Sequence, residues 1–262
     1  MRSSLGMTER ERHRLAPLAA ALARAATAGP PRLEPVAGDL PAGTRAGLLA
    51  GTFNPLTRAH TALAVAGHRA GLDRVVLAMA PRSLDKEGLA RAHPVDRLDW
   101  ASGWARRRPW AVVAVASHPL LVDMAEALGR LTGAQVTLLV GTDKAAQLVD
   151  ARYYDDLAAA LARLGRAATL LVADRSGHAL PDLPLTASRL PTPAWVPERS
   201  ATEAREAAAA GRPLRGLLPA AVARAVERTG AYDVDPTRYM ARARALDALL
   251  APAREARREA SR

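Results

Sequence analysis

The chain has 262 residues, with 37 Lys and Arg against 26 Asp and Glu, a formal net charge of +11 and no cysteine. Without thiols, a disulfide framework, a cysteine-ligated zinc or iron–sulfur site and a cysteine nucleophile are all excluded. No apolar run approaches the roughly 20 residues that span a bilayer, so we expect a cytoplasmic protein with no membrane partner. Lys86 and Lys144 are the only lysines. The positive charge is therefore nearly all arginine, most of it expected on a solvated surface.

Residues 1–45 predict an N-terminal helix followed by a linker. Leu15, Leu18 and Leu22 recur at spacings of three and four residues, which is typical of one buried helix face. Residues 29–43 are rich in proline and glycine, which favours a linker between this helix and the rest of the chain.

From residue 46 onward, short apolar runs alternate with stretches of helical pattern, as in a parallel sheet covered by helices. The runs are nearly continuous in apolar residues, which indicates strands buried on both faces. This pattern predicts an α/β fold, a Rossmann-like parallel sheet with helices on both faces. The predicted strands are residues 47–50, 74–79, 111–115, 136–140 and 169–172, and the predicted helices are approximately residues 59–71, 95–107, 119–131 and 154–165.

A second proline-rich stretch, residues 181–197, leads into a C-terminal helical part. The sequence thus predicts three parts: an N-terminal extension and linker over 1–45, a main domain over 46–232, and a helical tail over 233–262. The charged end of the tail is typical of a solvated helix.

The turn after the first strand of the main domain is where a ligand is expected, because open parallel sheets bind ligands beyond the carboxyl ends of their strands. Residues 51–60 read GTFNPLTRAH. Gly51 lets the backbone approach a ligand, Thr57 can cap the next helix, and His60 falls in its first turn. A helix N-terminus favours phosphate. Taken alone, each feature favours an ordinary capped helix after a glycine turn.

The whole string is more specific. It resembles the G-S/T-F-N/D-P-x-T/H-x-x-H signature of the nucleotidylyltransferase superfamily, and most of all the form found in nicotinamide/nicotinate mononucleotide adenylyltransferases. A P-loop nucleoside triphosphatase is excluded, because no G-x-x-x-x-G-K-S/T occurs. The resemblance implies that ATP is bound by Gly51, Thr52, Phe53, Asn54 and His60.

Further stretches follow in the order of the family. DKEGL at 85–89 is similar to a lysine-containing loop, which implies that Lys86 lies near the phosphates. GTD at 141–143 is similar to a Gly-x-Asp unit, in which Gly141 approaches the nucleoside and Asp143 accepts hydrogen bonds from ribose hydroxyls. On local grounds, a helix-capping role for this aspartate is as good an interpretation.

SATEAR at 200–205 is similar to the family's S-S-T-x-x-R unit, with Ala201 in place of the second serine. The resemblance implies that Ser200, Thr202 and Arg205 converge on the ATP triphosphate. It covers roughly residues 46–232.

The acceptor side is less well matched. The resemblance implies that the acceptor meets Asn54, Lys86, Tyr154, Arg175 and His118. Residues 117–119 read SHP where some pyridine-nucleotide enzymes have a stacking tryptophan. A structural role for His118 is therefore the alternative. Most of the four tryptophans, Trp100, Trp104, Trp110 and Trp195, are expected in the core.

The implied reaction transfers AMP from ATP to the phosphate of nicotinate or nicotinamide mononucleotide, giving a dinucleotide of the NAD type and pyrophosphate. The acceptor phosphate is already nucleophilic, so catalysis is expected to be positioning and electrostatics. His60, Thr57, Lys86 and Arg205 suit that task. Mg²⁺ is expected to bridge ATP oxygens, with no dedicated protein ligands.

Two alternatives remain. One is an enzyme of the same superfamily acting on another phosphorylated acceptor, such as phosphopantetheine or a sugar or polyol phosphate, with CTP as another nucleotide. The other is a non-catalytic nucleic-acid-binding protein of this fold, which is disfavoured because the basic residues are spread along the chain. The expected partners are therefore small molecules. The oligomeric state is open, and a homo-oligomer is one alternative.

Overall fold

The computed structural model describes residues 7–80, 92–174, 182–196 and 200–260, with side chains in the last helix described as far as residue 251. A sheet with the order β1-β4-β3-β2-β5-β6-β7 runs through the described residues. All its neighbouring strands are parallel except β1 and β4. The strands are β1 Leu33–Ala37, β2 Ala46–Ala50, β3 Arg74–Met79, β4 Ala111–Ala116, β5 Val136–Gly141, β6 Ala168–Ala173 and β7 Ala187–Arg189.

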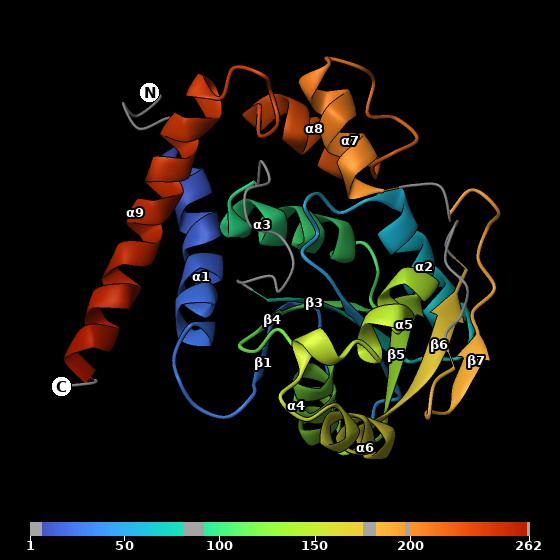
Figure 1. Ribbon diagram of the computed structural model, residues 1–262. Coiled ribbons are helices and arrows are strands. Elements are labelled where there is room, and N and C mark those ends of the chain that lie inside the picture. The colour runs from blue at the N-terminus through green and yellow to red at the C-terminus, as the bar shows by residue number, and fades with distance from the viewer. Residues whose placement is uncertain (1–6, 81–91, 175–181, 197–199, 261–262) are drawn as a thin grey trace.

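Helices cover both faces of the sheet, which confirms the predicted α/β class (Figure 1). They are α1 Glu9–Ala25, α2 Arg58–Arg69, α3 Pro94–Ala105, α4 Leu121–Thr132, α5 Thr142–Leu148, the 3₁₀ turn η1 Ala151–Tyr153, α6 Leu157–Ala167, α7 Ala201–Ala209, α8 Ala220–Thr229 and α9 Thr237–Ala260. The five predicted strands and four predicted helices all have counterparts here, with ends displaced by a few residues. Of the helices that the structure describes, none combines the length and the apolar character required to cross a bilayer.

The central strands show why their sequences are apolar throughout. Along β3, Val75, Leu77 and Met79 belong to the apolar cluster that includes residues of α1, α2 and α3, while Val76 and Ala78 belong to the cluster on the other face, which includes residues of α4. Successive side chains of a strand point to opposite faces, so a strand covered on both faces needs apolar residues at every position.

Two short strands lie in stretches that the sequence analysis assigned to proline-rich linkers. β1 carries Pro35 and pairs antiparallel with β4, and β7 spans three residues at the opposite edge. Proline cannot donate to a strand ladder, so it is tolerated only at edges. The prediction of a plain linker over 29–43 is therefore wrong, because an edge strand does not need a regular apolar pattern.

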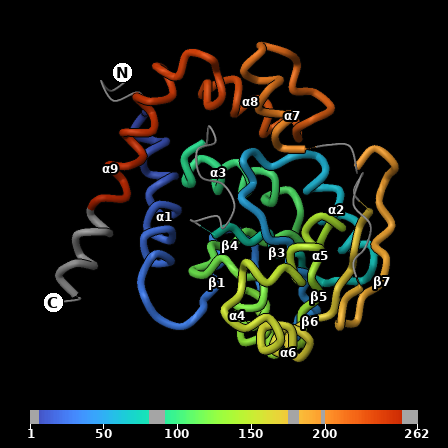
Figure 2. Tube along the Cα trace, viewed as in Figure 1, coloured from blue at the N-terminus to red at the C-terminus, as the bar shows by residue number. Residues whose placement is uncertain are grey.

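The two terminal helices pack side by side and against α3 (Figures 1 and 2). Asp96 of α3 is 0% exposed and accepts hydrogen bonds from Tyr239 (2.9 Å) and Arg242 (2.7 Å) of α9. Arg242 also bonds Glu11 of α1 at 3.3 Å. The buried charges are thus paired and hydrogen-bonded, which burial requires. Both chain ends share one apolar core with the sheet.

Candidate active site

The strand order reverses between β2 and β5, because the chain first builds β3 and β4 on one side of β2 and then returns to place β5 on the other. Such a reversal leaves a crevice at the carboxyl ends of the two strands, where ligands bind in open α/β sheets. A cavity of about 230 Å³ lies there. Three separated stretches line it: Gly51, Thr52, Thr57 and His60; Gly141, Asp143 and Lys144; and Ser200 and Ala201.

The loop after β2 is compact. Phe53 is 1% exposed, has a left-handed φ of 43°, and meets the His60 ring edge-on with centroids 5.3 Å apart. A Cβ atom at position 51 would lie 3.0 Å from the Phe53 ring. A glycine therefore fits at position 51, where the ring covers the turn.

His60 and Thr57 form a reciprocal cap at the start of α2. The Thr57 hydroxyl accepts from the His60 amide at 3.3 Å, and the Thr57 amide donates to His60 Nδ1 at 3.0 Å. Because Nδ1 accepts a backbone hydrogen bond, the neutral ring carries its proton on Nε2. His60 is thus oriented as a donor through Nε2, on a residue that lines the cavity.

Asn54 is turned away from the cavity. It is 4% exposed, and its Oδ1 accepts from the Ala92 amide at 3.1 Å and from the Tyr232 hydroxyl at 2.7 Å. Burial raises the pKa of the Tyr232 phenol well above its usual range, so the hydroxyl keeps the proton that it donates. The structure therefore gives Asn54 a loop-bracing task, and its predicted contacts with ATP and with the acceptor stay predictions.

Two buried arginines donate hydrogen bonds to backbone carbonyls of the loop after β2. Arg205 of α7, 9% exposed, donates to the Asn54 carbonyl at 2.9 Å and to the Thr202 hydroxyl at 2.9 Å. Arg97 of α3 donates to the Thr52 carbonyl at 2.7 Å. Arg205 is therefore joined to the loop that leads to His60, as a common ATP site requires. Contact of Arg205 and Thr202 with the triphosphate stays a prediction.

The sequence analysis gave Arg97 no site role. The signal was present in the pair Asp96 and Arg97, adjacent charges that lie with Asp99 among apolar residues in the first turns of the helix. Both are buried, which marks them as paired rather than solvated.

The strand β5 supplies the opposite wall. Gly141 ends this strand and caps α5, and Asp143 and Lys144 follow in its first turn. Lys144 Nζ donates to Gln147 Oε1 at 2.7 Å, and both residues line the cavity. The sequence analysis did not assign Lys144, although it is one of only two lysines and follows the GTD stretch directly.

Ser200 completes the cavity at the start of α7. Its hydroxyl accepts from the Glu203 amide at 3.0 Å, so it also caps this helix. A serine can do both, since a hydroxyl keeps a donor proton while accepting.

The expected acceptor side is a narrow crevice of about 20 Å³ that shares Lys144 and Gln147 with the cavity and is lined by Tyr154. Burial raises the pKa of the Tyr154 phenol, and the charge of Asp123 adds to the effect. His118 Nδ1 lies 2.8 Å from the Ser117 hydroxyl at the edge of this region. Lys86 and Arg175 lie outside the described residues.

Two tryptophans of the expected core, Trp100 and Trp104, are buried there, and Trp110 is partly buried against the same core. Trp195 is also partly buried against this core, and it lines a surface groove.

Solved structures similar to this chain include two of one enzyme. The nicotinic acid mononucleotide adenylyltransferase of Plasmodium falciparum complexed with NaAD matches with a TM-score of 0.57 and 11% identity, over 72% of this chain and 97% of that chain. The same enzyme complexed with APC matches with a TM-score of 0.52 and 10% identity, over the same shares. This chain shares the fold of that enzyme. By sequence, no family model and no curated protein matches it. The predicted fold is therefore confirmed, and the low identity restricts that conclusion to the fold.

Proposed function

We propose that this protein is an adenylyltransferase that transfers AMP from ATP to the phosphate of a mononucleotide, nicotinate or nicotinamide mononucleotide, and releases pyrophosphate. The observation that carries the proposal is the convergence of three sequence stretches, 51–60, 141–144 and 200–201, on one cavity at the strand-order reversal. Each stretch overlaps a motif for which the family resemblance implies contacts with phosphate or with the nucleoside.

The lining groups suit a reaction that needs charge stabilisation and no base. The Nε2 proton of His60 and the first amides of α2 would donate to phosphate oxygens, where negative charge develops. Lys144 would add a full positive charge. Asp143 would accept from ribose hydroxyls. Holding both phosphates in line then supplies much of the rate enhancement.

Mg²⁺ enters this proposal as part of the substrate MgATP. Among the described residues that line the cavity, Asp143 supplies the carboxylate, and no three His, Asp or Glu side chains in the described chain form a metal-binding group. Mg²⁺ commonly keeps waters and substrate phosphates as ligands, so this site fits the bound metal complex.

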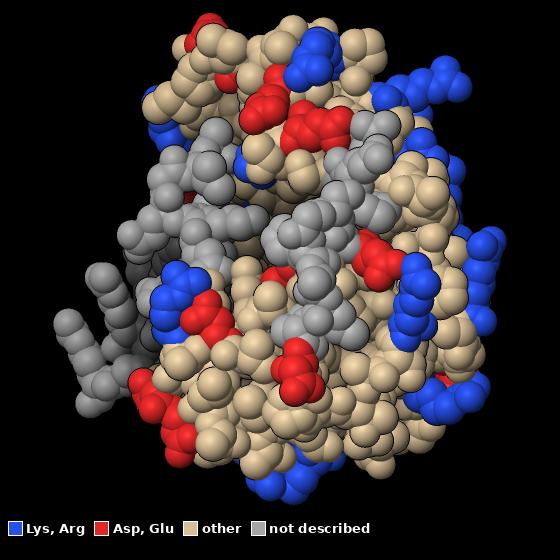
Figure 3. All heavy atoms as spheres, turned by 45° about the vertical axis from the view of Figure 1, so that its right-hand side comes forward, with Lys and Arg blue, Asp and Glu red and all other residues tan. Residues whose placement is uncertain are grey.

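A small-molecule acceptor is favoured over nucleic acid. On the face shown in Figure 3, basic side chains are separated by acidic and uncharged ones and form no continuous stripe. Nucleic-acid-binding surfaces gather basic residues in one patch. An acceptor other than a pyridine mononucleotide, such as a polyol phosphate, is favoured only by the small volume of the crevice beside Tyr154.

The test is incubation of the full chain with ATP, Mg²⁺ and one acceptor at a time, with pyrophosphate release and dinucleotide formation both measured. We expect dinucleotide with nicotinate or nicotinamide mononucleotide. Turnover only with phosphopantetheine or with a sugar or polyol phosphate would show that the proposed acceptor is wrong, and turnover only with CTP would show that the proposed nucleotide is wrong. In both cases the protein would still be a nucleotidylyltransferase. Salt-sensitive RNA or DNA binding without any turnover would refute the proposal.

A further inference from the structure

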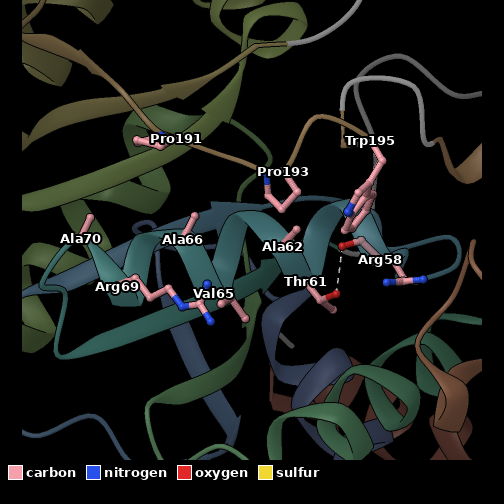
Figure 4. Close-up of a pocket in the computed structure, with 10 residues that line it drawn as sticks. All are labelled: Arg58, Thr61, Ala62, Val65, Ala66, Arg69, Ala70, Pro191, Pro193 and Trp195. Atoms are coloured by element: carbon pink, nitrogen blue, oxygen red, sulfur yellow. Dashed lines mark hydrogen bonds between the residues drawn. The ribbon is translucent and has the colours of Figure 1, made fainter.

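A second cavity, larger than the first, lies along another face of α2. Its volume is about 580 Å³, against about 230 Å³ for the cavity at His60. Ala62, Val65 and Ala66 line its helical side, and Pro193 and Trp195 of the segment between β7 and α7 line the other (Figure 4). Small-molecule sites in proteins are commonly about 300–1,000 Å³ and mostly apolar. We call this space the α2 groove.

The α2 groove is apolar for a reason that can be read from its residues. The helix presents alanines at positions 62, 66 and 70, so little side-chain volume fills the space. The opposite wall carries Pro191 and Pro193, which have no backbone N–H to offer. Thr61 is the polar residue between the two ends, and its hydroxyl donates to the Arg58 carbonyl at 3.0 Å. The middle of the groove therefore offers few of the hydrogen-bonding groups that recognise a base or a sugar.

Positive charge stands at both ends. Arg58 begins α2 and Arg69 ends it, which places their Cα atoms about 16 Å apart along the helix. The Arg58 guanidinium lies over the Trp195 ring, 4.9 Å from its centroid. In the part of the chain that the structure describes, neither arginine forms an ion pair with a carboxylate.

We propose that the α2 groove binds a free single-chain amphiphile with an anionic head, of which a medium-chain fatty carboxylate is the simplest example. The alkyl chain lies along Ala62 and Ala66 beneath Pro191 and Pro193. The head lies at Arg58, whose guanidinium is placed in the groove by Trp195, and not at Arg69, because the C-terminal end of a helix disfavours an anion. Trp195 holds the Arg58 guanidinium in place by a cation–π contact.

The test uses decanoate below its critical micelle concentration, titrated into the full chain in a calorimeter. We expect one bound decanoate per chain, with decanol binding at least tenfold more weakly because it has no charge for Arg58. Saturating MgATP should leave the decanoate affinity unchanged, since the groove and the nucleotide cavity use different faces of α2. These readouts do not depend on catalytic activity, so the outcome is independent of the proposed function.

Variants locate the site. Ala62→Phe should abolish decanoate binding by filling the groove, and Arg58→Gln should weaken it about tenfold, the value of one charge-assisted contact. Arg69→Gln should have the smaller effect. The matched controls are Ala158→Phe and Arg166→Gln on α6, since Ala158 is exposed and Arg166 is an exposed arginine in the last turn of its helix. Circular dichroism checks folding, and Ala70→Phe at the exposed rim serves if Ala62→Phe does not fold.

Absence of decanoate binding to the unmodified chain overturns the proposal. Equal affinities for decanol and decanoate would show that the groove does not recognise an anionic head, and would overturn that part of the proposal. Displacement by MgATP, or full binding in a folded variant with the groove filled, shows that decanoate binds elsewhere and overturns the site.

Discussion

The two sides of the candidate active site are held in different ways. The loop over residues 51–57 is bonded to distant parts of the chain: Tyr232 meets Asn54 across 178 positions and Arg205 meets it across 151. On the acceptor side the hydrogen bonds described above are local, such as that of Lys144 with Gln147, three positions away. The first side is fixed by the completed fold, and the second by short turns.

This difference has a functional meaning under the proposed reaction. The loop over residues 51–57 cannot shift without leaving the hydrogen-bonding groups of its carbonyls and of Asn54 unsatisfied. Under the proposed reaction, the amides that would face the phosphates are therefore preorganised. Local contacts such as Ser117 with His118 can be exchanged with less effect on the rest of the fold. We expect nucleotide binding to depend on the whole molecule and acceptor choice to depend on a few neighbouring residues.

The largest effect is expected from His60, which belongs to the rigid side. His60→Asn keeps an oxygen where Nδ1 accepts from Thr57 and removes the Nε2 donor. Loss of one preorganised donor lowers kcat by about 10²–10³, measured as pyrophosphate release, while the thermal midpoint should stay near that of the unmodified chain. His60→Ala should lose activity and also the acceptor of the Thr57 amide, which is one of the two bonds of the helix cap, about 0.5–1.5 kcal/mol. Unchanged kcat in His60→Asn would remove the catalytic assignment.

The next largest effect is on stability. It concerns the buried ion pair of Asp96 with Arg242, which lies next to the arginine that holds the loop over residues 51–57. Asp96→Asn leaves Arg242 buried without its main counter-charge, which typically costs about 3–5 kcal/mol. Urea unfolding measures it. The control is Asp73→Asn, which breaks the solvent-exposed pair with Arg45 and should change the midpoint little. Equal effects of the two substitutions would show that α9 does not support the fold as described.

A smaller change tests whether the hydrogen bond between Tyr232 and Asn54 affects the rate of the reaction. Tyr232→Phe removes the hydroxyl that donates to Asn54 and should cost about 1–2 kcal/mol of stability. It should also lower kcat/KM, because the loop loses one of its supports. Tyr239→Phe removes a buried hydroxyl that bonds Asp96 and not the loop. If the two variants lose activity to the same extent at matched stability, the special role of Tyr232 is wrong.

Lys144 probes the locally held side. Lys144→Gln removes a charge from a residue that lines both the cavity and the crevice. We expect KM for the acceptor to rise about tenfold, near 1.4 kcal/mol, with little change in stability. The exposed Arg166→Gln controls for a general loss of positive charge. A KM that stays unchanged would exclude Lys144 from substrate binding.

The smallest expected effect is a pH dependence at the start of α3. Burial lowers the pKa of His93 below its usual value, and the nearby Asp247 opposes this only in part. The neutral form is therefore favoured by folding, so its contribution is complete above the unfolded pKa of about 6.5 and is lost as the pH falls. His93→Asn keeps an acceptor for the Val95 amide. Between pH 7.5 and 5.5 the variant should lose less unfolding free energy than the unmodified chain.

Much of the fold was predictable because its signals are local. The strands from Ala46 to Ala173 are continuous apolar runs, and the capped start of α2 is written in Thr57 and His60. β1 escaped prediction because Pro35 and Glu34 interrupt its pattern, and it is stabilised by pairing with a strand nearly 80 positions later.

The candidate site divides in the same way. Residues that line the cavity were found from contiguous strings, as with Gly51, Asp143 and Ser200. The braces Arg97 and Tyr232 were not assigned, because their partners are separated from them by 45 and 178 positions. Pairing over such distances is decided by packing of the whole chain, so a local pattern such as the adjacent charges Asp96 and Arg97 indicates buried charges but not their partners.

The pairing of the two terminal helices also constrains how the protein is made. Glu11 and Arg242 are 231 positions apart, and Arg242 neutralises Asp96 on the helix whose next residue, Arg97, holds the Thr52 carbonyl. During synthesis, chains grow at about 5–20 residues per second and early segments fold first. Here the first helix must wait for nearly the last one to emerge from the ribosome. The loop over residues 51–57 therefore acquires its full support only after α9 has been synthesised.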